Sequence, residues 1–487
     1  MKKSGLWWKI AAAVLVFLVS GLIWIRIGPD RAPAGSRYQI LYPTFLGNGG
    51  RNFYGRGMPD SLAVVWQVYL GGSQTRVGKR ILDWSGTGWP GQPTMLREAG
   101  RNYIIIGGFD HKLRKLDAET GRVIWAYGFD DVIKGAATLM PIYRGGRDLV
   151  LILQGSRMGF NKNLGSAVVT SFRAIDADGR EAWRLNLRRT DSYSRDVDAS
   201  ALVLDTLLYL GAENGIFYII DPDPEKCVLK DGVLQPRVLK EITLYEPGDL
   251  VRHGGNLVAE ASPTLCGDRI YIAAGSGHVY GINRRTWEAD WRFDTGSDLD
   301  GTLSVTGDSC LLLTVEKQYI SDRGGVFKLD PRNPADQAVV WFFPTGNRRF
   351  SDWEGGVIGS AAVRDSLVAF RAIDGNLYLI NHYLFEPGAR SWFKKREYLQ
   401  PKLLAQVRLS PAIATSVIVD DRVLTVGYDD KMIIFSVDRK DAKTELTLRN
   451  CLIIPGFFES TPLVWNGRIY VGNRNGYFYC IGAKSAP

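Results

Sequence analysis

The fold is decided by a repeated pattern whose clearest copy runs from Glu260 to Phe293, EASPTLCGDRIYIAAGSGHVYGINRRTWEADWRF. Apolar residues alternate with others along it, as in the segment RIYI at 269–272, and a period of two is typical of β-strands. Gly277 separates two such segments at a position that fits a hairpin turn with positive φ. The stretch therefore predicts consecutive antiparallel strands joined by tight turns.

Further copies of this pattern cover most of the chain. The last one, ESTPLVWNGRIYVGNRNGYFYCIG from Glu459, matches the first almost element for element. The residue that closes the third strand marks each copy, and these markers are Asp117, Asp176, Asp221, Asn283, Asp330, Asn381, Asp438 and Gly482. Their spacing of 44 to 62 residues is typical of propeller blades and too long for leucine-rich or helical-pair repeats. We predict an all-β, eight-bladed β-propeller of four-stranded antiparallel blades.

One strand-like segment has no blade of its own. The segment SLAVVWQVYL runs from Ser61 to Leu70, whereas the last copy of the pattern stops near Ile481, before any fourth strand. A propeller must close so that no sheet edge is left open. We predict that residues 61–70 form the outer strand of the last blade, that the propeller spans residues 61–483, and that residues 28–60 are a linker and lead-in.

The first residues differ in character from the rest. Lys2, Lys3 and Lys9 precede an apolar run that carries no charge until Arg26. With Trp7 and Trp8 added, this run is long enough to span a bilayer. We predict a cytoplasmic tail at residues 1–5 and one transmembrane signal-anchor helix at residues 6–27, with the following domain exported. A cleaved signal peptide is the competing interpretation.

The composition excludes several classes of function. The formal charge is +9, but no run of five or more basic residues occurs, so we expect an ordinary solvated surface and no nucleic-acid partner. The four histidines lack ligand spacing, and the five cysteines form neither a Cys-x-x-Cys pair nor an adjacent pair. No phosphate loop or nucleophile elbow is present.

The repeat resembles that of the quinoprotein-type, or PQQ-like, propeller family. Ser262, Pro263, Tyr271 and Asn283 carry the resemblance in one copy, and the Thr-Gly-x-x-x-Trp tail at 120–125 carries it in another. The resemblance implies that a Trp on the outer strand of a blade docks against the neighbouring blade. The residues at that position are Trp66, Trp125, Trp183, Trp291 and Trp341.

Two branches of this family are candidates. One contains pyrroloquinoline-quinone dehydrogenases, whose cofactor lies on the propeller axis beside a calcium ion, and the other is the non-enzymatic BamB-like scaffold branch. The stretches RDVDASALV from Arg195 and SDLDGTLSV from Ser297 resemble the blade-start phrase of the scaffold branch. The adjacent cysteines, haem motif or several membrane spans typical of the enzymes are missing from the sequence.

The resemblance therefore implies a protein-binding scaffold, an accessory subunit of an envelope complex. We expect it to be anchored by one span in the bacterial inner membrane, with the propeller in the periplasm and protein partners in the cell envelope. We expect no catalytic residues and no cofactor. The alternative is a quinone- and calcium-dependent dehydrogenase.

Acidic residues recur where the innermost strands begin, and the repeat places them at the mouth of the axial channel. They are Asp198, Glu260, Asp300 and Glu459. Such a ring of like charges needs a cation or an arginine to compensate it, and calcium suits oxygen ligands. Because polar residues also simply hydrate propeller channels, we expect no resident metal.

Two long aromatic connections emerge on the same face as these acids. They run from Asp83 to Pro93 and from Gly346 to Gly356. Exposed Trp and Arg side chains favour contact surfaces. We therefore expect a partner-binding site formed by Trp84, Trp89, Arg348, Arg349, Phe350 and Trp353. The alternative is that these Trp side chains fold back onto the propeller.

Overall fold

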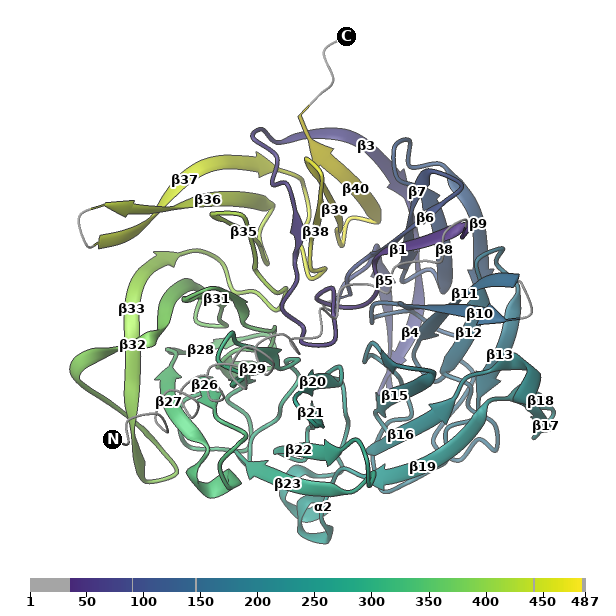
Figure 1. The fold of residues 1–487 in the computed structure, drawn as a ribbon, viewed down its shortest axis with the longest axis horizontal. Coiled ribbons are helices and arrows are strands. Elements are labelled where there is room, and N and C mark those ends of the chain that lie inside the picture. Colours follow the sequence, from purple (N-terminus) through teal and green to yellow (C-terminus); the bar gives the residue numbers. More distant parts are fainter. Residues whose placement is uncertain (1–35, 90, 145–146, 441–442, 484–487) are drawn as a thin grey trace, which may run out of the picture.

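Eight sheets surround a central axis, which confirms the predicted eight-bladed all-β propeller (Figure 1). The computed structural model describes residues 36–89, 91–144, 147–440 and 443–483. The transmembrane segment expected at residues 6–27 lies outside these ranges. Within them, no helix has both the length and the apolar character that a membrane span requires.

Each blade is an antiparallel sheet whose first strand lies nearest the axis. From the axis outward, blade 1 contains β6 (Thr94–Glu98), β7 (Arg101–Gly107), β8 (Lys112–Asp117) and β9 (Val123–Gly128), blade 2 contains β10 (Thr138–Arg144), β11 (Arg147–Gly155), β12 (Phe172–Asp176) and β13 (Glu181–Leu185), and blade 3 contains β14 (Leu202–Leu204), β15 (Leu207–Ala212), β16 (Ile216–Asp221) and β19 (Arg237–Thr243). Blade 4 contains β20 (Thr264–Cys266), β21 (Arg269–Ala273), β22 (His278–Asn283) and β23 (Ala289–Asp294), and blade 5 contains β24 (Ser304–Val305), β25 (Leu311–Val315), β26 (Gly325–Leu329) and β27 (Val339–Pro344).

The remaining blades follow the same order. Blade 6 contains β30 (Ala362–Arg364), β31 (Leu367–Arg371), β32 (Asn376–Phe393) and β33 (Arg396–Arg408), blade 7 contains β34 (Val417–Val419), β35 (Arg422–Val426), β36 (Lys431–Lys440) and β37 (Lys443–Ile453), and blade 8 contains β38 (Leu463–Trp465), β39 (Arg468–Gly472), β40 (Tyr477–Gly482) and β3 (Ala63–Tyr69). The elements outside the four-strand pattern are β1 (Tyr38–Tyr42), β2 (Gly55–Arg56), the hairpins β4 (Gly72–Val77)–β5 (Arg80–Ser85), β17 (Val228–Lys230)–β18 (Val233–Gln235) and β28 (Asn347–Phe350)–β29 (Trp353–Gly355), the helix α2 (Pro247–His253) and the short helices η1 (Pro224–Lys226) and η2 (Ala335–Gln337).

The outer strand of blade 8 comes from the start of the chain. β3 pairs antiparallel with β40, from Ala63 opposite Gly482 to Tyr69 opposite Tyr477. This is the pairing expected for residues 61–70, and we call β3 the closing strand. Both ends of the propeller sequence thus meet in one sheet, so no blade is left with an open edge.

Residues 38–60 are part of the propeller body rather than a linker. β1 pairs with β6 on its axial side, and β2 runs parallel to β38, so blades 1 and 8 each have five strands. Between them the chain passes through the centre of the propeller (Figure 1). Phe45, Leu46 and Tyr54 are buried there. The expectation of a lead-in separate from the domain was wrong because this segment lacks the repeat pattern yet fills space that the blades leave open.

Tryptophans tie neighbouring blades together as the family resemblance implied. Each indole Nε1 donates a hydrogen bond to a backbone carbonyl of the next blade. The pairs are Trp66 to Ala118 (3.1 Å), Trp125 to Ala177 (2.9 Å), Trp183 to Pro222 (2.8 Å), Trp291 to Asn333 (3.1 Å) and Trp341 to His382 (3.1 Å). Four of these carbonyls belong to the residue directly after a marker Asp or Asn, at the end of the third strand.

The marker residues have a structural role of their own. The Asp117 side chain accepts hydrogen bonds from the backbone N–H groups of Glu119 and Thr120, both at 3.0 Å. Asn283 accepts from Arg285 at 2.9 Å in the same way. Such local bonds build Asx-type turns, which explains why Asp or Asn recurs at this position.

We expect Trp183→Phe to lower the free energy of unfolding by about 2–3 kcal/mol. Trp183 is fully buried, and the smaller ring leaves a void and an unpaired Pro222 carbonyl. Denaturant unfolding measures this change. The control Trp392→Phe alters a tryptophan that is 61% exposed and should change stability by less than about 0.5 kcal/mol. Equal effects for both variants would contradict the docking role.

Candidate functional site

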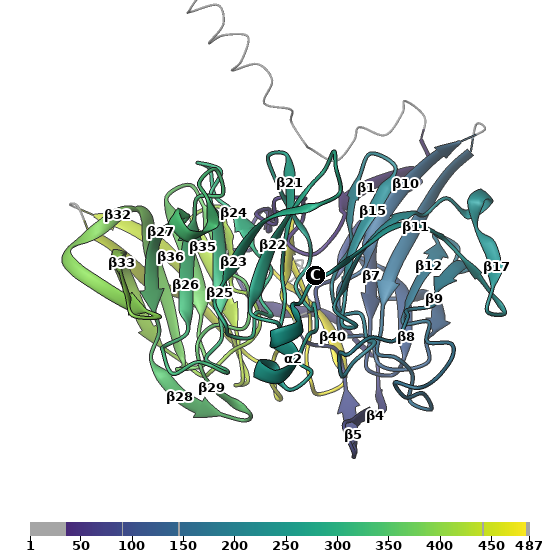
Figure 2. The same cartoon turned by 90° about the horizontal axis from the view of Figure 1, so that it is seen from below.

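Two hairpins extend one face of the propeller. β4–β5 lies between the closing strand and β6, and β28–β29 lies between β27 and β30. Both project from the lower side in Figure 2. They lie in the two connections that the sequence marked as long and aromatic.

An open cavity of about 320 Å³ lies on this face, and we call it the aromatic groove. Seven aromatic residues line it together with Ser351, Glu459 and Arg474; they are Trp84, Trp89, Phe109, Phe350, Trp353, Tyr428 and Phe457. Their rings pack against one another, with centroids 5.2 Å apart for Trp84 and Phe109 and 5.8 Å apart for the stacked pair Trp89 and Trp353.

Four of the six residues expected at a partner site line this groove, namely Trp84, Trp89, Phe350 and Trp353. Arg348 and Arg349 do not. Both are exposed on β28, and Arg348 donates to the Asp374 carbonyl at 3.4 Å. The aromatic side chains are half-buried, so folding back onto the propeller and forming an accessible wall are both true of them.

The groove carries a neutralised pair of charges. Glu459 accepts hydrogen bonds from the Tyr428 hydroxyl at 2.8 Å and from an Arg474 Nη at 2.6 Å. The Arg474 guanidinium lies over the rings of Phe109 and Phe457, 4.8 and 5.5 Å from their centroids. Burial, together with Glu459, raises the pKa of Tyr428 above its ordinary value. The groove is therefore apolar in character and electrically balanced.

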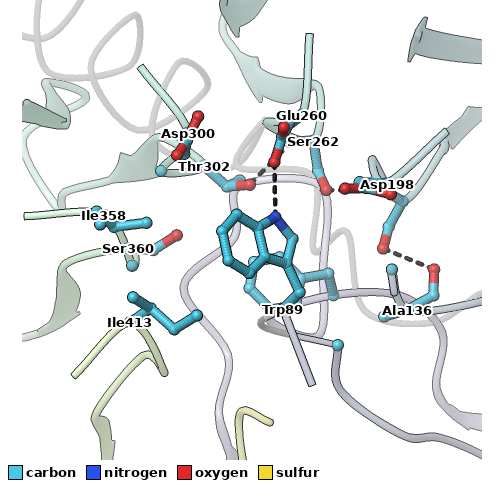
Figure 3. Close-up of a pocket in the computed structure, with 16 residues that line it drawn as sticks. Trp89, Ala136, Asp198, Glu260, Ser262, Asp300, Thr302, Ile358, Ser360 and Ile413 are labelled. Carbon is cyan, nitrogen blue, oxygen red and sulfur yellow. Dashed lines mark hydrogen bonds between the residues drawn. The ribbon is translucent and has the colours of Figure 1, made fainter. Parts of the chain in front are cut away.

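Trp89 separates the aromatic groove from the propeller axis. Its Nε1 donates to Glu260 Oε2 at 2.7 Å, and its ring faces Lys134 Nζ at 5.1 Å (Figure 3). Its backbone has a φ of 58°, which is rare for a bulky residue and is held here by these contacts. Trp89 and Phe45 both line the axial cavity, of which about 30 Å³ remains. That is roughly the volume of one water molecule.

Hydroxyl side chains link the blades around this cavity. The Ser262 hydroxyl accepts from the backbone N–H of Ser200, and the Thr302 hydroxyl accepts from that of Ser262, both at 2.9 Å. The Thr415 hydroxyl accepts from Ser360 in the same way, at 3.0 Å. Because each blade is bonded to the next at its inner end, the cavity is narrow and its walls are held in place.

Three of the four predicted channel acids converge beside Trp89. Asp198, Glu260 and Asp300 line the axial cavity with it (Figure 3). The expectation of a ring of four was wrong, because Glu459 lines the aromatic groove and is bound by Arg474 and Tyr428.

Further carboxylates that the sequence did not single out complete this cluster. Asp198, Glu213 and Glu260 form one group, and Asp298, Asp300 and Glu316 form a second; in each, ligand oxygens lie within 4.8 Å of one another. Glu213 directly follows β15, and Glu316 directly follows β25. An alignment of the second strands would have placed these two glutamates at equivalent positions, whereas the markers used above follow the third strand.

Burial disfavours the charged form of these carboxylates. It raises the pKa of Asp198 to about 6, against the lowering effect of Lys134. Burial and the neighbouring Glu260 raise the pKa of Asp298 to about 7. Burial also raises the pKa of Glu213, Asp300 and Glu316 well above the ordinary values.

Two cations compensate part of this charge. Lys134 forms an ion pair with Asp198 and lies 3.8 Å from Glu213 Oε1. Burial alone would lower the pKa of Lys134, but Asp198, Glu260 and Glu213 outweigh it and raise the pKa. Arg157 Nε donates to Asp196 at 2.7 Å, and Asp196 is the residue that the sequence paired with Asp198.

Comparisons with known proteins agree with this architecture. A model of PQQ-type repeats, described as outer membrane protein assembly factor BamB, matches residues 59–259. The outer membrane protein assembly factor BamB of Burkholderia pseudomallei (strain K96243) is 28% identical over 137 residues, which is 27% of this chain and 29% of that relative. The chain thus aligns with less than a third of the length of this curated relative.

Solved structures share the fold along most of the chain. BamB from Moraxella catarrhalis superposes with a TM-score of 0.50 and 12% identity, covering 88% of this chain and 99% of its own. Quinohemoprotein alcohol dehydrogenase from Comamonas testosteroni gives a TM-score of 0.57 and 13% identity, covering 95% and 84%. The chain belongs to the PQQ-like propeller family. At these identities, the two solved structures show the fold of this PQQ-like propeller and nothing about its activity.

The enzyme branch of the family implies a planar quinone on the axis beside calcium, and the two groups fit this PQQ-like propeller differently. The axial cavity of about 30 Å³, closed by Trp89 and Phe45, has no room for a planar quinone. Clustered carboxylate oxygens, in contrast, are the donors that calcium prefers. The residues present therefore do not fit the cofactor but do fit a hard cation.

Proposed function

We propose that this PQQ-like propeller is a protein-binding scaffold of the bacterial cell envelope, an accessory subunit of an assembly complex like its BamB relatives. The aromatic groove is the observation that carries the proposal. Aromatic side chains that form a concave, half-buried surface are what dominates the energy of protein interfaces. A volume of about 320 Å³ matches one or two large apolar side chains of a partner.

The charge pair inside the groove supports a protein partner. Glu459 is already bound by Arg474 and Tyr428, so it exerts little pull on a charged ligand. The rings around it offer apolar contact, and the exposed Arg348 and Arg349 lie nearby in sequence on β28 as a polar rim. Interfaces have this arrangement of an apolar centre with a charged border.

The same geometry disfavours the alternative of a quinone-dependent dehydrogenase. Such an enzyme needs its cofactor, its cation and a carboxylate base together on the axis. Here Trp89 lies where that space would be. Incubation with pyrroloquinoline quinone and calcium, followed by a dye-reduction screen over alcohols and sugars, should give no turnover; robust turnover would overturn the scaffold proposal.

The cellular placement is part of the proposal. We propose that residues 6–27 anchor the chain in the inner membrane and that the propeller lies in the periplasm. Support comes from the apolar run without charge before Arg26 and from the BamB relatives. N-terminal sequencing of the protein from the membrane fraction tests it: a start at Met1 agrees with the anchor, whereas a start near Leu22 or Gly35 would contradict it.

Trp353→Ala is expected to weaken partner binding by about 2 kcal/mol or more, which is roughly 30-fold in affinity. Trp353 packs against Trp89, Phe350 and Tyr428, so its loss removes the centre of the groove. The measurement is in-cell crosslinking, with quantitative recovery of the proteins captured by the full chain.

Trp392→Ala is the matched control, since this tryptophan is exposed on β32 and does not line the groove. The proposal requires at least one envelope protein that is recovered with wild type and Trp392→Ala and lost with Trp353→Ala. Identical recovery for all three chains would show that the groove is not the binding site.

A further inference from the structure

The two carboxylate groups at the axis differ in one respect. We call Asp198, Glu213 and Glu260 the lysine triad, and Asp298, Asp300 and Glu316 the open triad. Both are built alike. In each, a glutamate follows the second strand of a blade directly, and at least one aspartate lies in the connection that leads to an inner strand. They come from adjacent blades, which makes a direct comparison of their charges meaningful.

The lysine triad contains its own counter-charge. The Lys134 ammonium group pairs with Asp198 and lies 3.8 Å from Glu213. Glu260 in addition accepts the hydrogen bond from Trp89 at 2.7 Å. Two of its three acids therefore face an ammonium group, and the third is hydrogen-bonded.

The open triad has no such partner. Asp298 accepts hydrogen bonds from Asn256 at 2.5 Å and from the Leu299 N–H at 2.9 Å, and both donors are neutral. Glu316 is only 3% exposed, and among the described residues no hydrogen bond or ion pair reaches its carboxylate. Lys134 forms no ion pair with these three acids.

Burying three neighbouring carboxylates without a cation is costly, because each loses its hydration and repels the others. An unpartnered carboxylate pointing into such a cluster is a ligand without its ion. We propose that Asp298, Asp300 and Glu316 bind one hard divalent cation, Ca²⁺ in preference to Mg²⁺. All the donors are oxygens, and the larger ion tolerates an irregular arrangement of carboxylates better than Mg²⁺ does.

The cation takes the role in the open triad that Lys134 has in the lysine triad. It thereby fixes the connection between β23 and β24 at the axis, beside Trp89 and the aromatic groove. This site does not depend on the proposed partner, since it is detected by cation binding alone.

The test is calorimetric titration of the chelator-treated full chain with Ca²⁺ and, separately, with Mg²⁺. We expect one Ca²⁺ per chain and weaker Mg²⁺ binding. Glu316→Gln should weaken Ca²⁺ binding by at least about tenfold, since a direct ligand matters no less than its surroundings. Glu213→Gln is the matched control at the equivalent position of the lysine triad, and it should bind Ca²⁺ as wild type does.

Thermal unfolding in chelator keeps the result independent of folding defects. Glu316→Gln should melt at or above the wild-type temperature without cation, because the amide removes a like charge, and should no longer be stabilised by added Ca²⁺. Three outcomes would overturn the proposal: no Ca²⁺ binding by wild type in the millimolar range, undiminished binding by Glu316→Gln, or loss of binding in Glu213→Gln instead.

Discussion

A chain shortened to begin at Gly71 is expected to lose cooperative unfolding and to associate through blade 8. It lacks the closing strand, so β40 becomes an unpaired edge, and it also lacks β1 and β2 on the axial side of blades 1 and 8. An open edge of this kind pairs readily with other chains. Circular dichroism during heating and sedimentation velocity measure the two effects. A single sharp transition of a monomer, close to that of the full chain, would contradict the closing role.

A point substitution separates the closing strand from the rest of the deleted segment. Trp66→Ala removes the hydrogen bond to Ala118 and the packing on Tyr470 and Phe478, and should cost about 3–5 kcal/mol. Trp291→Ala is the matched control, with the same 3.1 Å bond to a neighbouring blade.

The two variants should differ in how they unfold. β23 is joined to β22 by a turn, whereas β3 is held to β40 only by pairing and packing. Limited proteolysis should therefore cut Trp66→Ala within residues 60–70 while the rest of the chain is still folded, and should not cut Trp291→Ala there. Equal proteolytic patterns would show that the interface next to the closing strand is no weaker than the others.

Arg51→Met is expected to lower the free energy of unfolding by at least about 4 kcal/mol, because a buried guanidinium leaves several unpaired acceptors when it is removed. Arg51 is fully buried at the axis, and burial lowers its pKa to about 9. It donates to the carbonyls of Pro263 at 2.8 Å and Phe45 at 2.8 Å, and to that of Ser200 at 3.2 Å. It thus joins the N-terminal segment to blades 3 and 4.

Denaturant unfolding of Arg51→Met and of the control Arg56→Met tests this role. Arg56 is exposed and donates one side-chain bond to Asn466, so its loss should cost less than about 1 kcal/mol. Arg51→Lys should be nearly as damaging as Arg51→Met, since one ammonium group cannot reach the same set of carbonyls. Stability within 1 kcal/mol of wild type for Arg51→Met would refute the role of Arg51 as an axial fastener.

The fold could be predicted because its information is local and repeated. Asp117 and Asn283 mark turns that their own side chains stabilise, and Trp125 or Trp183 marks a contact between adjacent blades. Both signals recur at blade length, so one sequence contains several independent copies of each. The closing strand followed from a different kind of reasoning, since an unmatched strand and an incomplete blade explain each other.

What escaped prediction occurs once and depends on long-range contact. Arg51 lies in the Gly-rich stretch GNGGRNFYGRG, which resembles a loop, and its partners Ser200 and Pro263 are far away in sequence. Strand β32 continues past the marker Asn381 to Phe393, which packs on Phe327 and Phe342 of blade 5. Repeat matching is silent about such features because no other blade has them.

The candidate site was predicted in part for the same reason. Aromatic residues in two connections were visible, and geometry gathered Trp84, Trp89, Phe350 and Trp353 into one groove. Charge compensation was not visible. Lys134 and Arg474 each lie outside the acid-bearing phrases, and only the structure shows that one faces Asp198 and the other Glu459.

The direction of β1 decides how the groove is presented to other molecules. Tyr38 pairs with Glu98, at the end of β6 farthest from the connection that contributes Trp84 and Trp89. The chain therefore enters the propeller on one face, while the groove opens on the other (Figure 2). Whatever the residues before Ser36 are attached to, the groove points away from it. A partner can then approach from the opposite side without competing for space with that attachment.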